Sequence, residues 1–443
     1  QKRAAASQDP LAAPGLPPGL PSGLALMRPA NVGILAVEAY VPRAFVPQTA
    51  LEVQDECEGK YVVGLGQDAM AFVDDREDIC SVLLTACAAL LERYGVQPSE
   101  VGRLEVGTET LIDKSKSAKT TLLRLFPNVR DIEGATSTNA CYGGTAALLN
   151  SCAWVESSAW DGRFAIVVCG DIAVYSPGSA RPAGGCAAVA MLVGPDAPLA
   201  LQPTRATCAL DVWDFYKPFH SEYAAVDGTL SQQCYLRSVD DCWRAWKAKR
   251  ESRGESSEFD YCCFHAPYNK LVQKGFARLR LGDAVSSKGG DFHAYAETWC
   301  VAGDATYEAS LSDKGLDARL RELSADAYRA KAACAAKLPK AVGNAYTASV
   351  FLGLASLVDG KAAELERGAR VLLFSYGSGS LATMYSLVGR EPEGGRFSLR
   401  RMANVLDVVN KLQGRRECTA AHFACRRRRK RPATALDSGR SRL

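Results

Sequence analysis

The chain has 443 residues, 47% of them hydrophobic and 23% charged, which is the usage of an ordinary globular protein. This length exceeds one ordinary domain, so two packed units or one large layered fold are expected. No apolar run approaches the roughly 18 residues of a membrane span, and the sixteen cysteines form no CxxC pair, which argues against a zinc site or a disulfide scaffold.

The formal net charge of +4 is unevenly distributed along the chain. Residues 411–443 carry eleven Lys/Arg and two Asp/Glu, so the remaining 410 residues sum to −5. The run "RRRRKR" at 426–431 lies in this basic segment, but no nucleic-acid-binding motif accompanies it. We therefore predict a mildly acidic folded body followed by a basic, disordered tail over 411–443, with no nucleic-acid or membrane partner.

In chain order, the first segment is a leader over 1–30 with six prolines, predicted to be disordered, and Met27 is interpreted as the native start. A buried strand is predicted over 31–42 and a helix over 81–95. Further strands are predicted over 103–113 and 163–176. Strands that alternate with helices are typical of an α/β fold, whose functional groups gather at strand ends.

An internal repeat follows from two pairs of segments. "TNACYGGTAALLNS" (138–151) resembles "GNAYTASVFLGLAS" (343–356), and "GGCAAVAMLVG" (184–194) resembles "GSLATMYSLVG" (379–389), in the same order. The repeat predicts duplicated halves over 31–204 and 205–410. Halves related by a pseudo-twofold axis would bring the turn at Cys141 close to the turn at Asn344.

Three side chains are candidates for acid–base and nucleophilic chemistry. Cys141 precedes a predicted helix, where the dipole is expected to lower the pKa of its thiol. Glu109 ends a strand, where apolar neighbours would raise the pKa of its carboxyl. His265 stands where an apolar strand meets a loop, and Lys270 and Lys274 form a cationic stripe suited to phosphates. These groups fit acyl transfer through a thioester and also a cysteine hydrolase.

The motifs "VGTETLIDKSKS", "NACYGGTAAL", "WDGRFAIVVCGDIAVY", "DFYKP", "FHAPYNKLVQK", "GNAYTAS" and "SYGSG" resemble the eukaryotic type of 3-hydroxy-3-methylglutaryl-CoA (HMG-CoA) synthase from about residue 32 to about 405. The resemblance implies a thiolase-like fold with five αβαβα layers, built from two duplicated halves, and a homodimer. It implies condensation of acetyl-CoA with acetoacetyl-CoA and water to HMG-CoA and CoA in the mevalonate pathway. It implies no metal or cofactor besides the CoA thioesters, and a cytoplasmic location, with mitochondrial or plastid import as alternatives.

The same resemblance assigns roles to individual residues. It makes Cys141 the nucleophile that takes the acetyl group, Glu109 the base that removes a methyl proton, and His265 the residue that orients acetoacetyl-CoA. Positions that resemble substrate and CoA contacts are Lys60, Ser179, Ser231, Lys270, Lys274, Asn344 and Ser378. Supporting carboxylates are Asp113, Asp171 and Asp214. The family usually has Asn at Ser179 and Thr at Ala183, and the likeness is expected to fade after about residue 405.

Two other functions fit the same residues. A ketoacyl synthase III or thiolase-type enzyme shares the fold, but such enzymes usually pair the cysteine with His and Asn or with a second Cys. A catalytically impaired binding protein would keep the fold and lose the reaction, which the intact set of Glu109, Cys141 and His265 opposes.

Overall fold

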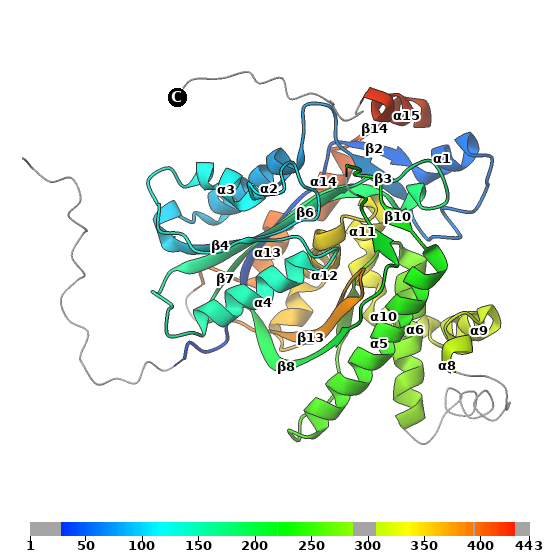
Figure 1. Cartoon of the computed structure of the whole chain (residues 1–443). Helices are drawn as coiled ribbons and strands as arrows, with labels where there is room; N and C mark the ends of the chain where they lie inside the picture. Colours follow the sequence, from blue (N-terminus) through cyan, green and yellow to red (C-terminus); the bar gives the residue numbers. More distant parts are fainter. Residues whose placement is uncertain (1–27, 219, 287–306, 393–394, 430–443) are drawn as a thin grey trace, which may run out of the picture.

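The computed structural model describes residues 28–218, 220–286, 307–392 and 395–429 of the chain. The predicted leader, up to residue 27, lies outside the described residues, as does the end of the tail from residue 430. The described strands form a nine-stranded sheet in the order β11-β12-β13-β8-β1-β7-β6-β4-β5, with a two-stranded sheet (β10-β9) and a three-stranded sheet (β14-β2-β3) beside it (Figure 1).

The strands have the following bounds: β1 Gly33–Tyr40, β2 Ala44–Pro47, β3 Ala69–Phe72, β4 Val101–Gly107, β5 Thr136–Ser137, β6 Phe164–Ala173, β7 Gly185–Gly194, β8 Leu199–Ala209, β9 Phe215–Tyr216, β10 Ala225–Val226, β11 Tyr261–Phe264, β12 Arg370–Gly377, β13 Leu381–Gly389 and β14 Arg416–Glu417. The α-helices have the following bounds: α1 Gln48–Gln54, α2 Ile79–Tyr94, α3 Ala118–Leu122, α4 Gly143–Val155, α5 Gly228–Glu251, α6 Asn269–Ser286, α8 Tyr307–Ser310, α9 Lys314–Leu323, α10 Ala325–Lys331, α11 Lys337–Val342, α12 Ser349–Glu366, α13 Leu399–Leu406, α14 Val408–Gln413 and α15 Ala420–Arg429. The strands predicted over 31–42 and 163–176 and the helix over 81–95 are confirmed as β1, β6 and α2, whereas the strand predicted over 103–113 is β4, which ends at Gly107, so that residues 108–113 form a loop.

The large sheet consists of two halves with the same pairing. In the first half β4 pairs with β6 in parallel, β6 with β7 antiparallel and β7 with β1 antiparallel. In the second half β11, β12, β13 and β8 pair in the same succession of parallel, antiparallel and antiparallel contacts. The halves meet where the first residues of β1 pair with β8. The predicted duplication is therefore confirmed.

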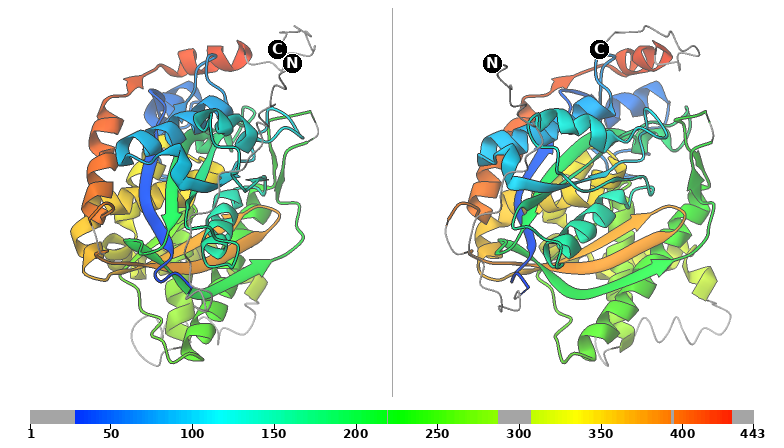
Figure 2. Two further views of the ribbon diagram at one scale, coloured as in Figure 1. Left: turned by 90° about the vertical axis from the view of Figure 1, so that its left-hand side faces the viewer. Right: turned by 60° about the vertical axis from the view of Figure 1, so that its left-hand side comes forward.

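Five layers follow from where the helices pack. Helix α2 packs on β1, β6 and β7 on one outer side, and α5 packs on β8 and β13 on the other. Helices α4 and α12 lie between the two halves of the sheet. Their apolar side chains form one core with the strands of both halves, so each half of the sheet counts as one β layer. Figures 1 and 2 show α2 and α3 at one side of the molecule and α5 and α6 at the opposite side. This is the predicted αβαβα arrangement of a thiolase-like fold.

Local sequence explains how individual elements begin and end. Asp78 caps α2 by accepting a hydrogen bond from the backbone N–H of Ser81, whose hydroxyl accepts one from the N–H of Asp78. Gly95 ends the helix with φ +63°, in the left-handed region that favours glycine. Strand β7 is buried along its whole length because helices cover both faces of the sheet, which explains its uninterrupted run of apolar and small residues.

The C-terminal segment differs from the prediction. The tail was expected to be disordered over 411–443, and this is wrong for residues 411–429. Strand β14 pairs in parallel with β2, and the Phe423 ring of α15 packs on Phe72 with the ring centroids 5.2 Å apart. Lys411 pairs with Glu38, which is buried in β1. Contacts with the first 75 residues therefore order this basic segment. The composition of the segment itself gives no sign of these long-range contacts.

Candidate active site

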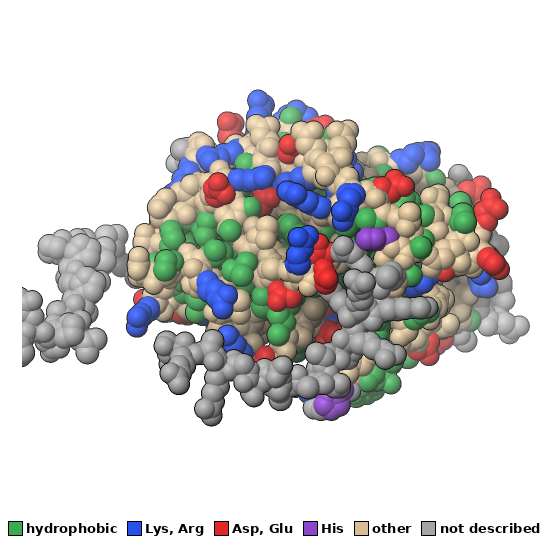
Figure 3. Space-filling model, turned by 90° about the horizontal axis from the view of Figure 1, so that it is seen from above, with side chains coloured by type: hydrophobic (Ala, Val, Ile, Leu, Met, Phe, Trp, Pro, Cys, Tyr) green, Lys and Arg blue, Asp and Glu red, His purple; other side chains and the backbone are tan. Residues whose placement is uncertain are grey.

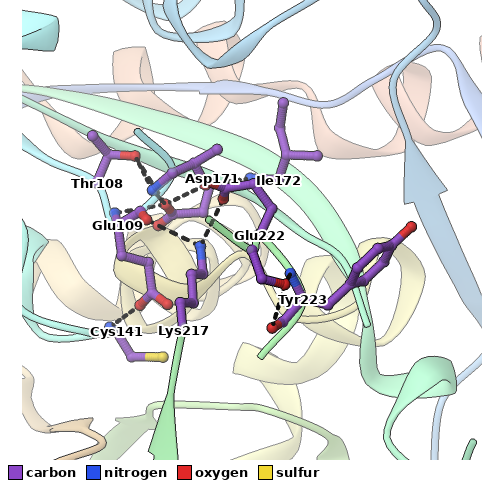
Figure 4. A network of polar contacts seen from close by, with 10 residues as sticks. Thr108, Glu109, Cys141, Asp171, Ile172, Lys217, Glu222 and Tyr223 are labelled. Atoms are coloured by element: carbon purple, nitrogen blue, oxygen red, sulfur yellow. Dashed lines mark hydrogen bonds and ion pairs between the residues drawn. The ribbon is translucent and has the colours of Figure 1, made fainter. Parts of the chain in front are cut away.

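Glu109 and Cys141 are brought together at the end of β4. Glu109 lies two residues beyond the strand and Cys141 lies two residues before α4, and both side chains are buried. The backbone N–H of Cys141 donates a hydrogen bond of 2.5 Å to Oε2 of Glu109 (Figure 4). The proximity expected from strand-end reasoning is therefore observed for this pair.

The turn at Cys141 has an uncommon backbone conformation. Cys141 has φ +53°, in the left-handed region that non-glycine residues seldom adopt. The position that corresponds to it in the second half is Tyr346, which has φ +41°. The two side chains share one buried cluster with Tyr175. The repeat thus predicted correctly that the Cys141 turn and the Asn344 turn meet.

Glycines allow this close packing. A Cβ on Gly144 would lie 2.9 Å from Cβ of Cys169 and would also overlap the carbonyl oxygen of Thr347. A Cβ on Gly143 would lie 2.7 Å from the carbonyl oxygen of Ser137. The two glycines after Cys141 are therefore required because β5, β6 and the second half leave no room for side chains.

Asp171 joins the two halves beneath the site. Its Oδ1 accepts hydrogen bonds from the hydroxyls of Thr108 and Thr110, both 2.8 Å, and from the backbone N–H of Glu109 and Thr110. Its Oδ2 accepts from the N–H and the hydroxyl of Thr347, at 3.0 and 2.6 Å. Six donors therefore hold one buried carboxylate, and through it the Glu109 loop is tied to the second half.

Burial dominates the ionisation of the Glu109–Cys141 pair. Burial, with the charge of Asp171, raises the pKa of Glu109 to about 8, which agrees with the predicted direction. Burial and the charge of Glu109 raise the pKa of the Cys141 thiol well above its ordinary value. The prediction that a helix N-terminus lowers this pKa is therefore wrong: α4 starts two residues later, and loss of solvent outweighs its dipole.

His265 follows the last residue of β11 and is buried. Its ring stacks on Tyr376 with the centroids 6.4 Å apart, and its Nδ1 is buried without a hydrogen-bond partner among the described residues. Burial lowers the pKa of His265 to about 3, so the imidazole is neutral at physiological pH. No described hydrogen bond links His265 to Glu109 or Cys141. The structure therefore connects Glu109 and Cys141 with each other more directly than with His265.

Lys217 is a site residue that sequence reasoning missed. Its Nζ donates a hydrogen bond of 3.0 Å to the carbonyl oxygen of Glu109 and lies 3.3 Å from Oε2 of Glu222 (Figure 4). The same ammonium stands 5.5 Å from the centre of the Tyr346 ring. The motif "DFYKP" contains Lys217, so the signal was present, but nothing in the local sequence links it to Glu109.

A cleft of about 1040 Å³ opens beside Glu109. Its wall includes the loop after Glu109, the segment that carries Lys217 and Glu222, and Phe423 from α15. Figure 3 views the molecule from above, with acidic and basic side chains interspersed among apolar ones on this face. Carboxyl and ammonium groups thus face a largely apolar cavity, which suits an acyl substrate.

Other predicted residues take different positions around this centre. Asp214 is buried and accepts hydrogen bonds from the hydroxyl of Tyr376 and the N–H of Gly379, at 3.1 and 2.8 Å. The side chain of Asn344 accepts a hydrogen bond from the N–H of Tyr346. Asp113 is exposed at the cleft wall, where it accepts from the N–H groups of the two residues Ser115 and Lys116. Ser179 is exposed and Ser378 is half-buried.

The predicted CoA-binding lysines lie on the second half and a neighbouring loop. Lys60 is exposed, and the N–H of Lys270 donates to the carbonyl of Leu65, which places the two segments side by side. Nζ of Lys274 lies 3.7 Å from a carboxylate oxygen of Asp317, so this ion pair already offsets part of the lysine charge. Ser231, in the first turn of α5, is half-buried.

The described ranges contain neither a candidate metal site nor a candidate membrane span. There, no group of three or more His, Cys, Asp or Glu side chains is placed to hold a metal ion. None of the helices in the same ranges has the length and apolar character needed to cross a membrane.

The duplicated five-layer fold, with a buried cysteine beside a glutamate where the halves meet, defines a thiolase-type condensing enzyme. Two family profiles cover nearly the whole chain: the N-terminal part of hydroxymethylglutaryl-coenzyme A synthase matches residues 28–198, and its C-terminal part matches residues 200–435. The chain belongs to the hydroxymethylglutaryl-CoA synthase family. It is therefore an acyltransferase that condenses acetyl-CoA with acetoacetyl-CoA. The match to residue 435 corrects the expectation that the likeness fades after about 405.

Individual relatives agree with the family. The hydroxymethylglutaryl-CoA synthase erg13A of Aspergillus fumigatus is 46% identical over 374 residues, which cover 80% of this chain and 79% of the relative. The mitochondrial hydroxymethylglutaryl-CoA synthase of Homo sapiens is 44% identical over 410 residues, covering 89% and 81%. The solved structure of MvaS in complex with 3-hydroxy-3-methylglutaryl coenzyme A is 33% identical, with a TM-score of 0.79 over 93% of this chain and 94% of that one.

Proposed function

We propose that the condensation proceeds through an acetyl group on Cys141, with Glu109 as the acid–base residue and His265 as an orienting residue. The observation that carries this proposal is the direct contact between Glu109 and Cys141 beside the cleft. A ketoacyl synthase III or thiolase would usually place His and Asn, or a second Cys, next to the nucleophile. Here the acidic partner argues for the HMG-CoA reaction.

In the first step the Cys141 sulfur attacks the acetyl carbonyl of acetyl-CoA. The S–C bond to Cys141 forms and the bond to CoA breaks, while the thiol proton passes through Glu109 to the departing CoA sulfur. A pKa of about 8 suits Glu109 to this exchange, because both protonation states are accessible near neutral pH. Covalent attachment also fixes the acetyl group beside the second substrate.

In the second step the Glu109 carboxylate removes a proton from the acetyl methyl group, and the resulting carbanion attacks the ketone carbon of acetoacetyl-CoA. Neutral His265 has an N–H that can hydrogen-bond the ketone oxygen as charge develops there. The alkoxide takes up the proton that Glu109 removed, and water then cleaves the thioester, its hydroxyl going to the acyl group to release HMG-CoA and its remaining proton restoring the Cys141 thiol. Atoms and protons balance with acetyl-CoA, acetoacetyl-CoA and water as the only reactants.

Substrate binding and assembly complete the proposal. Lys60, Lys270 and Lys274 would bind the phosphates of CoA. Nearer the acyl chain, the substrate would contact Ser231, Asn344 and Ser378. Ser179 would contact it from the loop between β6 and β7. We infer a homodimer, because the cleft wall exposes Ile112 (63%) and Tyr216 (42%), which a second copy would cover. We also infer a cytoplasmic location and a role in the mevalonate route to sterols and other isoprenoids, in line with the absence of disulfides among the described cysteines. Sedimentation tests the homodimer, and cell fractionation tests the location.

Labelling with acetyl-CoA tests the mechanism. The protein is incubated with radiolabelled acetyl-CoA, the modified peptide is mapped by mass, and acetoacetyl-CoA is then added. We expect the label on Cys141 and its discharge as HMG-CoA. Cys141→Ala should accept no acetyl, whereas Glu109→Ala should accept it and condense poorly. Equal labelling of Cys141→Ala would contradict the proposed role of the cysteine, and absence of labelling in the wild type would favour a catalytically silent protein.

A further inference from the structure

The position of Lys217 among acidic groups invites an explanation. Its side chain is 16% exposed and lies at the cleft wall, although a lysine side chain is usually solvated. Three partners surround it: the Glu109 carbonyl, the Glu222 carboxylate and the face of the Tyr346 ring. Figure 4 shows the side chain reaching from its own segment towards the main chain of Glu109. Because three different groups contact this one ammonium, we infer that Lys217 has a specific role in the site.

The charges around Lys217 define that role. The buried acids Glu109, Asp171 and Cys141 face one another from the loop after β4, from β6 and from the turn before α4. The positive charge of Lys217 lowers the pKa of all three, against the larger effect of burial. Tyr175 and Tyr346, which share a buried cluster with Cys141, have raised pKa values and stay neutral.

Glu222 competes for the same ammonium. Its side chain is 53% exposed and its oxygen lies 3.3 Å from Nζ of Lys217, so solvent weakens the pair and the carboxylate can leave it at small cost. When the pair is closed, Glu222 offsets part of the charge that Lys217 directs towards Glu109. When it is open, the full charge acts on the buried acids.

We propose that Lys217 is a positioning residue for the condensation, which holds the Glu109 loop by its carbonyl and supplies the positive charge that lets Glu109 and Cys141 ionise beside the apolar cavity, with Glu222 as the opposing charge. This inference rests on the proposed function only in taking Glu109 as the base. It assigns opposite electrostatic effects to two residues of one ion pair.

The test compares the pH dependence of kcat in Lys217→Met, Lys217→Arg and Glu222→Gln. The limb that rises with pH reports ionisation of Glu109. Lys217→Met should move its midpoint up by about one pH unit, since an opposite charge nearby shifts a carboxyl by that order. Lys217→Arg should leave it near the wild-type position. Glu222→Gln should move it down, by a smaller amount because the pair is half-exposed.

A second measurement needs no turnover. The rate at which iodoacetamide alkylates Cys141, followed against pH, should shift in the same directions in the same variants. Loss of activity at every pH with unchanged midpoints would mean that Lys217 is only structural and would overturn the inference. If Lys217→Met does not fold, the direction of the Glu222→Gln shift alone decides. If the wild type makes no HMG-CoA, the proposed function fails, but the alkylation profiles still test Lys217.

Discussion

Replacing Glu109 with glutamine should stabilise the protein and abolish its condensation. The folded state holds a proton on Glu109 up to a pKa of about 8, whereas the unfolded chain releases it near 4.5. Stability from this carboxyl is therefore intact below pH 4.5 and falls as pH rises from 4.5 to about 8. Since pH 7 lies about 2.5 pH units above 4.5 and each unit corresponds to about 1.4 kcal/mol, burying Glu109 costs about 3 kcal/mol at pH 7.

Glutamine has the same shape, still accepts the hydrogen bond from Cys141 and carries no such cost. Urea unfolding followed by fluorescence should show Glu109→Gln more stable by about 3 kcal/mol at pH 7 and by less than about 1 kcal/mol at pH 5. The exposed Glu92 on α2 provides the control, because Glu92→Gln should change stability by no more than about 0.5 kcal/mol at either pH. A gain from Glu109→Gln that is equal at pH 5 and pH 7 would refute the reasoning.

Three further outcomes follow from the geometry. Gly144→Ala should lower the unfolding free energy by about 2 kcal/mol or more, because the added methyl would overlap Thr347. The control is Gly360→Ala, also in a helix but with open space around it, which should be neutral or stabilising. Equal effects of the two substitutions would contradict the overlap at Gly144. In NMR titrations His265 should stay neutral down to about pH 4, and a midpoint near 6.5 would show that it is solvated. Phe423→Ala should cost about 3 kcal/mol in thermal unfolding, whereas an unchanged melting point would mean that α15 does not dock.

Much of the fold could be predicted from the sequence. The apolar strands and the helix over 81–95 have strong periodic patterns with clear end signals, and the repeat identified the duplicated halves. The contact between Glu109 and Cys141 followed from the rule that strand ends share one edge of a sheet. Matching left-handed φ values at Cys141 and Tyr346 show that the likeness of the two segments extends to the backbone.

The remaining features depend on contacts between residues far apart in the chain. The pKa of Cys141 rises because several segments together exclude water, whereas the sequence shows only the helix that follows. Lys217 reaches Glu109 across 108 positions, and Phe423 is ordered by Phe72 across more than three hundred. The charge pattern of the tail suggested disorder because the few apolar residues that dock it are outnumbered by arginines.

The carboxylate of Asp171 has a consequence for how the molecule unfolds. Four of its donors come from its own repeat and two, the N–H and the hydroxyl of Thr347, come from the other, so separating the repeats would leave this buried charge with fewer partners. We therefore expect that neither repeat opens alone and that the polypeptide melts as one cooperative unit, with calorimetric and van't Hoff enthalpies in agreement. The two duplicated halves should thus behave as one thermodynamic unit, and the contact that joins them lies at the active site.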